Sequence, residues 1–191
     1  MSLLILASSS PRRQQILKEL GLNFTVSPPV NFEEKLDGVA PEKLVCDNAL
    51  GKAREIASKY TNSIIIGCDT LIIENNEIFG KPLTPEKAYM MLKKLSGNYH
   101  SVVSGLAVID SRENKELVGC EKAEVKFKDL AESEIRDYVE SGEPLDKAGA
   151  YGIQGSGGKF VEEIKGSYSS VVGLPKELLL KFISELGIKI S

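Results

Sequence analysis

Two apolar runs constrain the fold more than any other feature of this sequence. One is "LLILA" at residues 3–7, and the other lies within "SIIIGCDTLIIE" at residues 63–74. A strand with apolar residues on both faces must be covered on both sides, as in the interior of a helix-flanked sheet. We therefore expect a buried strand at residues 3–7, and a second one at residues 63–74 that is interrupted from Gly67 to Thr70.

Patterns typical of amphipathic helices lie between and after these runs. Prolines, which suit the first turn of a helix, open four of them, at Pro11, Pro41, Pro85 and Pro175. Another helix is predicted at residues 132–141, further strands at residues 23–27, 99–110, 117–127 and 159–164, and a hairpin joining 71–73 to 77–79. Because helices and strands mix without strict alternation, we expect one α/β domain over residues 1–191, with a mixed sheet and flanking helices.

The composition excludes several classes of protein. Hydrophobic residues make up 42% of the 191, and the net charge of −3 argues against a general binder of nucleic acid or of membrane surfaces. No apolar run approaches the roughly 18 residues of a membrane-spanning helix, and no signal peptide is evident. We therefore expect a cytoplasmic protein that binds neither nucleic acid nor membrane.

The cysteines and the histidine exclude further chemistries. Cys46, Cys68 and Cys120 are odd in number and match no metal or redox spacing, so we expect free, buried thiols. His100 is the only histidine, which nearly excludes a histidine-based zinc site. Any Ser-His-Asp triad would have to use it, and no nucleophile-elbow pattern supports one.

The segment "SSSPRR" at residues 8–13 joins the first strand to the first helix. A helix start presents unpaired N–H groups and the positive end of the helix dipole, so anions bind there. Ser8 and its two neighbours add hydroxyl groups, and Arg12 and Arg13 add guanidinium groups suited to phosphate oxygens. The pattern fits a phosphate-binding site, and also a capped helix with two solvated arginines.

A second candidate is Asp69, which follows the apolar strand in "IIIGCDT". A carboxylate in the interior of a sheet costs several kcal/mol unless another group pairs with it. Asp69 could therefore be a metal ligand or a general base. An aspartate that caps a turn would give the same local pattern.

Other polar residues are ambiguous when each is taken alone. The pair Glu33 and Glu34 could bind Mg²⁺ or be solvated, and Lys52 and Lys81 could be surface charges. Gln154 lies in a glycine-dense segment and could read a nucleotide base or belong to an ordered loop. Taken together, cationic, hydroxyl and acidic residues without a covalent nucleophile system favour metal-assisted hydrolysis at phosphorus.

Seven motifs give the sequence a resemblance to a known family. They are "LASSSPRR", "FEEK", "GCDT", "GKP", "LSG", "PLDKAGAYGIQG" and "GSYSSVVGLP". Their order and spacing resemble those of the Maf family of nucleoside triphosphate pyrophosphatases, from Leu3 to about Pro175. The resemblance implies an inosine-triphosphatase-like fold with a curved sheet and two lobes around a cleft. It also implies hydrolysis of a nucleoside triphosphate to the monophosphate and pyrophosphate, with Mg²⁺ or Mn²⁺ as the cofactor.

The resemblance also implies roles for particular residues. Asp69 would activate water, and Glu34 and Asp69 would hold the metal. The residues expected to contact phosphates are Ser8, Arg12, Arg13, Lys52 and Lys81.

The resemblance also implies that three positions of the same motifs set the base specificity. The residues at these positions, Arg12, Thr70 and Gln154, are similar to those of the subfamily that acts on dTTP and UTP. A neutral amide can bond both the O4 acceptor and the N3–H donor of a pyrimidine, which agrees with that expectation. Two alternatives stay open, namely a pyrophosphatase for another nucleotide and a non-catalytic, nucleotide-binding regulator of cell division. A homodimer would also fit the family.

Overall fold

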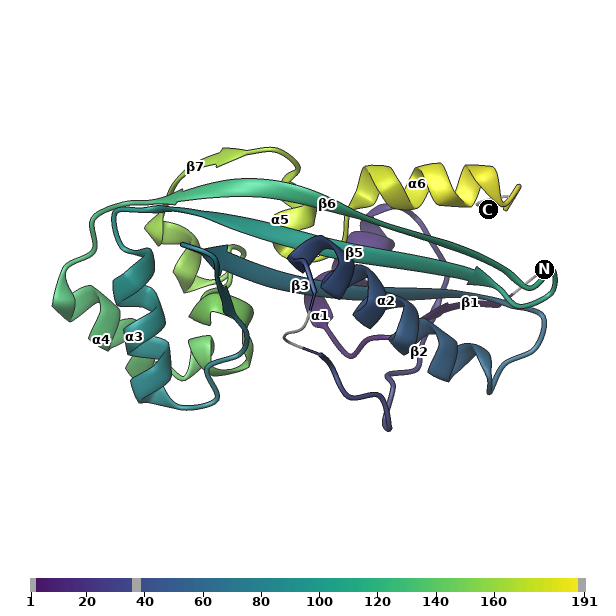
Figure 1. Ribbon diagram of the computed structural model, residues 1–191, viewed down its shortest axis with the longest axis horizontal. Helices are drawn as coiled ribbons and strands as arrows, with labels where there is room; N and C mark the ends of the chain where they lie inside the picture. The colour runs from purple at the N-terminus through teal and green to yellow at the C-terminus, as the bar shows by residue number, and fades with distance from the viewer. Residues whose placement is uncertain (1–2, 36–38, 189–191) are drawn as a thin grey trace. The chain divides into compact units, whose positions relative to one another are not determined.

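The structure is a computed structural model that describes residues 3–35 and 39–188. The chain divides into two compact units, which are described separately below (Figure 1). The first unit consists of Met1–Asp69, Ser104–Glu121 and Gly173–Ser191, and the second of Thr70–Val103 and Lys122–Val172. Two units agree with the two predicted lobes. The single domain, the curvature of the sheet, the inosine-triphosphatase likeness and the cleft stay predictions.

Within the described residues, the strands form one mixed sheet of seven in the order β2-β1-β3-β5-β6-β7, with β4 paired to β3. Their bounds are β1 Leu3–Leu6, β2 Thr25–Val26, β3 Ser63–Glu74, β4 Glu77–Phe79, β5 Tyr99–Asp110, β6 Lys115–Phe127 and β7 Val161–Lys165. β1 is parallel to both β2 and β3, whereas β4 is antiparallel to β3 and β7 is antiparallel to β6. The predicted mixed sheet is therefore confirmed.

The first unit is built around β1 and the amino-terminal half of β3, which pair from Leu3 with Ser63 to Leu6 with Ile66. Its helices are α1 (Pro11–Glu19), α2 (Pro41–Ala57) and α6 (Lys176–Glu185). In Figure 1, α2 runs along the strands of this unit. The apolar face of α2 closes over the residues of β1, β3 and β5 that share one face of the sheet, in a cluster formed by Ile5, Ala7, Ala49, Ala53, Ile56, Ile65, Ala107 and Ile109.

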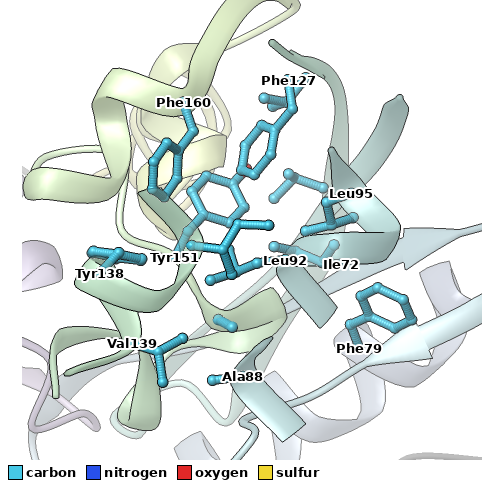
Figure 2. Close-up of a cluster of buried hydrophobic side chains, with 14 residues drawn as sticks. Ile72, Phe79, Ala88, Leu92, Leu95, Phe127, Tyr138, Val139, Tyr151 and Phe160 are labelled. Atoms are coloured by element: carbon cyan, nitrogen blue, oxygen red, sulfur yellow. The ribbon is translucent and has the colours of Figure 1, made fainter. Parts of the chain in front are cut away.

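The second unit has its own core, which is rich in aromatic side chains (Figure 2). Its helices are α3 (Pro85–Leu95), α4 (Glu132–Glu140) and α5 (Tyr168–Val172). The rings of Phe127 and Tyr151 pack edge to face with centroids 4.8 Å apart, and those of Tyr138 and Phe160 do so at 5.1 Å. Such pairs add stability beyond the apolar area that they bury.

The predicted hairpin between residues 71–73 and 77–79 is confirmed. Asn75 and Asn76 form its turn with φ angles of 47° and 64°, in the left-handed region that asparagine tolerates. The predicted start of α3 is also confirmed, since the Thr84 hydroxyl accepts a hydrogen bond from the Lys87 N–H at 3.3 Å.

Some expectations were wrong. β3 continues through Gly67–Thr70 without interruption. The helix α5 was not predicted, because serine and valine are weak helix formers. All three cysteines are free thiols as predicted, but only Cys68 is buried, while Cys46 and Cys120 are half-buried.

No helix within residues 3–35 and 39–188 is long and apolar enough to cross a membrane.

His100 gives the second unit a testable pH dependence. Its ring is buried, its Nε2 lies 2.8 Å from the Tyr151 hydroxyl, and its Nδ1 has no partner among the described residues. Burial lowers the pKa of His100 from 6.5 to about 4. The unfolded chain therefore binds this proton more readily than the native protein, so stability falls as the pH drops from 6.5 toward 4.

We expect His100→Gln to remove this pH dependence. Relative to the variant, the wild-type protein should lose about 3 kcal/mol of unfolding free energy between neutral pH and pH 4, since each unit of pKa shift corresponds to about 1.4 kcal/mol. Urea unfolding of both proteins across this range measures the difference. Parallel curves for the two proteins would contradict the assignment.

Candidate active site in the first unit

Asp69 is a buried carboxylate in the middle of β3, with only 4% of its surface exposed. Its Oδ1 accepts a hydrogen bond from the Lys52 ammonium at 2.7 Å, and its Oδ2 accepts one from the Asn48 amide at 2.9 Å. A carboxylate oxygen can accept two bonds, so each keeps capacity for another partner. Asp69 is thus held rigidly and is not a turn cap.

Lys52 links Asp69 to a second carboxylate. Its Nζ lies 2.5 Å from Glu34 Oε1 and 2.7 Å from Asp69 Oδ1, so one ammonium group bridges both acids. The side chain of Lys52 is 8% exposed and that of Glu34 is 41% exposed. Lys52 is therefore not a surface charge, and Glu34 is the member of the acidic pair that reaches the buried site.

Two glycines allow α2 to lie close enough for these contacts. A Cβ atom on Gly67 of β3 would lie 2.2 Å from the Ala49 carbonyl oxygen, and one on Gly105 of β5 would lie 2.3 Å from the Val45 carbonyl oxygen. Neither position can take a side chain without moving the helix backbone. Gly67 and Asp69 share one face of the strand, because side chains alternate along it, and that face is the one covered by α2.

The acidic loop, residues 30–35, is fastened to the same helix. The Glu55 carboxylate accepts hydrogen bonds from the N–H groups of Val30, Asn31 and Phe32 at 2.9, 3.1 and 2.8 Å. Asn48 Oδ1 accepts the Lys35 N–H at 3.0 Å, and Asn48 Nδ2 donates to the Lys35 carbonyl at 2.9 Å. These contacts fix the backbone on both sides of Glu34.

A glycine on α2 also makes room for the acidic loop. A Cβ atom on Gly51 would lie 2.0 Å from the Phe32 ring, so the ring rests on the bare helix backbone. This packing adds an apolar contact to the hydrogen bonds at either end of the loop.

The serine–arginine segment contacts β3 at Cys68, the residue before Asp69. Arg13 donates through Nη1 to the Ser8 hydroxyl and to the Cys68 carbonyl, both at 3.0 Å, and through Nε to the Gly173 carbonyl at 2.9 Å. Arg13 is therefore not a solvated arginine. The Cys68 carbonyl also lies 3.4 Å from Lys52 Nζ, which connects this segment to the Asp69 site.

The structure brings together Ser8, Arg13, Glu34, Lys52 and Asp69 of the predicted residues. Arg12 is half-buried on α1, next to Arg13 in the chain.

The other three predicted residues belong to the second unit. Thr70 is half-buried in β3, while Lys81 and Gln154 are exposed in loops. The loop of Lys81 is held by a hydrogen bond from the Gly149 N–H to the Gly80 carbonyl at 3.1 Å.

Sequence reasoning missed Asn48 and Glu55, which hold the acidic loop. A signal for Asn48 was available, since it lies four residues before Lys52 and therefore on the same side of the helix. The sequence pattern does not single out Glu55, because glutamates are common on the polar faces of helices.

Glu34 and Asp69 are two carboxylates on one site that could share a divalent cation. Among the described residues no group of three histidine, cysteine or acidic side chains could hold a metal. Mg²⁺, however, is usually bound by one or two carboxylates together with substrate phosphates and water. Glu34 and Asp69 already share one cation, the Lys52 ammonium, so they lie close enough to share another.

A buried acid held by a lysine and an amide, beside a second acid and a serine–arginine helix start, is an arrangement that can serve acid–base or cation chemistry. A family model described as "Maf-like protein" matches residues 3–186. The chain therefore belongs to the Maf family.

Several curated relatives match the chain over nearly its whole length. A "dTTP/UTP pyrophosphatase" of Dictyoglomus thermophilum is 46% identical over 96% of both chains. Proteins of the same name are 43% identical in Methanosarcina mazei, over 100% of this chain and 97% of that one, and 44% identical in a Geobacillus species, over 98% and 100%. A solved structure of a HAM1 protein from Coxiella burnetii matches 97% of this chain and 100% of that one at 15% identity, with a TM-score of 0.49.

The glycine contact under α2 yields one prediction. We expect Gly67→Ala to destabilise the protein by about 1–3 kcal/mol, because overpacking forces the helix backbone to shift. A Cβ atom on Gly119 of β6 would meet only the ends of two side chains, the Phe182 ring at 3.2 Å and Leu178 Cδ2 at 3.4 Å, so Gly119→Ala serves as the control. Chemical denaturation compares the two variants, and equal stability would contradict the proposed close contact.

The Glu55 hydrogen bonds yield a second prediction. The bond from the Val30 N–H, followed by that from the Lys59 ammonium and then by those from the loop amides of Asn31 and Phe32, lowers the pKa of Glu55 from 4.5 to about 2. Because the native pKa lies below the unfolded value, the stabilisation is complete above pH 4.5 and is lost as the pH falls toward 2.

We expect Glu55→Gln to lower the Tm at neutral pH, with a difference from wild type that vanishes toward pH 2. Glu33→Gln removes one negative charge from the acidic loop itself and serves as the control for the change of charge. Thermal unfolding at several pH values tests this, and a Tm difference for Glu55→Gln that persists near pH 2 would refute it.

Proposed function

We propose that this Maf-family protein hydrolyses dTTP and UTP to the nucleoside monophosphate and pyrophosphate. Its relatives that are named dTTP/UTP pyrophosphatase, at 43–46% identity, support this activity. The observation that carries the proposal is the buried Asp69 carboxylate, fixed by Lys52 and Asn48 beside a second acid.

In the proposed reaction Asp69 accepts a proton from the attacking water. Lys52 and Asn48 each occupy one carboxylate oxygen and so hold the base in one orientation, while each oxygen keeps capacity for a bond to water. The water oxygen attacks the α-phosphorus, the bond to the bridging oxygen breaks, and pyrophosphate leaves. Positioning and charge neutralisation supply most of the rate in such phosphoryl transfers.

Cationic and hydroxyl groups near Asp69 would bind the triphosphate. Ser8, Arg12, Arg13 and Lys52 are assigned this role from the family resemblance, and the contacts of Ser8, Arg13 and Lys52 around the Cys68 carbonyl support it. The roles of Lys81 at the phosphates, and of Arg12, Thr70 and Gln154 in selecting a pyrimidine base, stay predictions.

Glu34 and Asp69 would hold a divalent cation, Mg²⁺ or Mn²⁺. When bound, it would neutralise phosphate charge and polarise the phosphoryl oxygens. Both acids face the Lys52 ammonium, whose single positive charge offsets one of their two negative charges. A cytoplasmic location, where nucleotides are abundant, completes the proposal; the homodimer stays a prediction.

The proposal is tested by measuring pyrophosphate release from dTTP, UTP, GTP and 7-methyl-GTP, with and without Mg²⁺ or Mn²⁺. We expect turnover of the two pyrimidine nucleotides to exceed that of the others and to require a metal. Turnover of another nucleotide alone would favour the different-substrate alternative, and nucleotide binding without any turnover would favour the regulator.

Asp69→Asn tests the proposed base directly. The substitution keeps the shape of the side chain but removes the proton acceptor, so kcat should fall by about 10²- to 10⁴-fold. Circular dichroism and the Tm serve as controls for folding. Near-normal pyrophosphate release by a folded variant would remove Asp69 from the catalytic step.

A further inference from the structure

Asn48 is a fully buried amide whose polar atoms are all engaged. Its Nδ2 donates to Asp69 Oδ2 and to the Lys35 carbonyl, each at 2.9 Å, and its Oδ1 accepts the Lys35 N–H at 3.0 Å. Asparagine is a weak helix former, and a buried amide is costly unless it is hydrogen-bonded. Its place in the middle of α2 therefore calls for a reason beyond helix formation.

The two bonds to Lys35 decide which way the amide points. A backbone N–H can only donate and a backbone carbonyl can only accept, so Asn48 Oδ1 must face the N–H and Nδ2 the carbonyl. The remaining N–H of Nδ2 is then directed at Asp69 Oδ2. The backbone of the acidic loop thus sets the orientation of the group that holds the carboxylate.

Asn48 and Lys52 hold the two oxygens of Asp69 separately. They lie four residues apart on α2, hence on the same side of the helix. Lys52 also contacts Glu34, whereas Asn48 contacts the backbone of the next residue, Lys35. The acidic loop and Asp69 are therefore connected twice, once through a charge and once through a neutral amide.

We infer that Asn48 is a positioning residue that couples the acidic loop to the orientation of Asp69. This inference rests on the proposed function in that Asp69 is the base. Asn48 touches neither the water nor the phosphates in this role, and it acts through the Asp69 carboxylate. Loss of its amide donor leaves one oxygen of the base unheld, while Lys52 continues to hold the other.

The structure supplies a matched comparison. Glu55 fastens the other end of the acidic loop, at Val30, Asn31 and Phe32, and has no hydrogen bond to Asp69. Glu55→Gln therefore weakens the loop contacts and the pair with Lys59 but leaves both oxygens of Asp69 held, whereas Asn48→Leu loosens the loop and frees one oxygen of the base. Asn48→Asp keeps an acceptor for the Lys35 N–H and, when ionised, has no donor for Asp69.

The experiment measures kcat and KM for dTTP, together with hydrogen exchange of the loop amides, in these three variants and the wild type. We expect kcat to fall by about 10- to 100-fold in both Asn48 variants, since small displacements of a reacting group cost that much. Glu55→Gln should raise KM and the exchange rates at residues 30–32 without a comparable loss of kcat. The Lys35 amide should lose protection in Asn48→Leu and keep it in Asn48→Asp.

Two results would overturn the inference. One is a kcat near the wild-type value in a folded Asn48→Leu or Asn48→Asp protein. The other is an equal loss of kcat in Glu55→Gln, because the effect would then arise from the loop alone. If Asn48→Leu does not fold, the nearly isosteric Asn48→Asp carries the test. A wild-type protein without turnover would instead refute the proposed function, so the two failures are distinguishable.

Discussion

The buried contact between Lys52 and Asp69 is the interaction on which the site depends. Removing one partner of a buried ion pair typically costs about 3–5 kcal/mol, because the other charge is left uncompensated. Here the pair joins a helix to a strand through two residues that are 17 positions apart in the chain, and the ammonium also contacts Glu34. The strand can carry a carboxylate in its interior only because the helix brings a cation to it.

The contact depends in turn on small residues. Gly67 and Gly105 let the backbone of α2 approach two strands, and Gly51 lets Phe32 rest on the helix itself. A side chain at Gly67 or Gly105 would push the helix away from the strands. The tight packing and the contacts around Asp69 therefore have one cause, namely the absence of Cβ atoms along the path of one helix.

The acidic loop shows how an exposed segment can be held in place. Its backbone N–H groups are bound at one end by the Glu55 carboxylate and at the other by the Asn48 amide. Both holders belong to α2, which also carries Lys52. The helix is thus the scaffold for the proposed base, the second acid and the cation between them.

Much of the fold could be predicted from the sequence, because apolar runs, proline-led helices and the Asn75–Asn76 turn are local patterns. The predicted break in β3 failed for a physical reason, since an aspartate in a strand is normally too costly and its partners could not be seen. The sequence identified Asp69, Glu34 and the serine–arginine segment as candidates, but not Asn48 or Glu55. Those two act through contacts with residues 13 to 25 positions away.

The amino-acid sequence by itself determined the apolar strands, the helix faces and the motifs of the Maf family, since each is a property of neighbouring residues. Only the tertiary structure decided that Lys52, one lysine among many, is buried against Asp69 and Glu34. The reason is that a helix pattern shows which face is apolar, but not which strand it covers or how closely it lies. That distance is set by Gly67, whose role appears only when the helix rests on it.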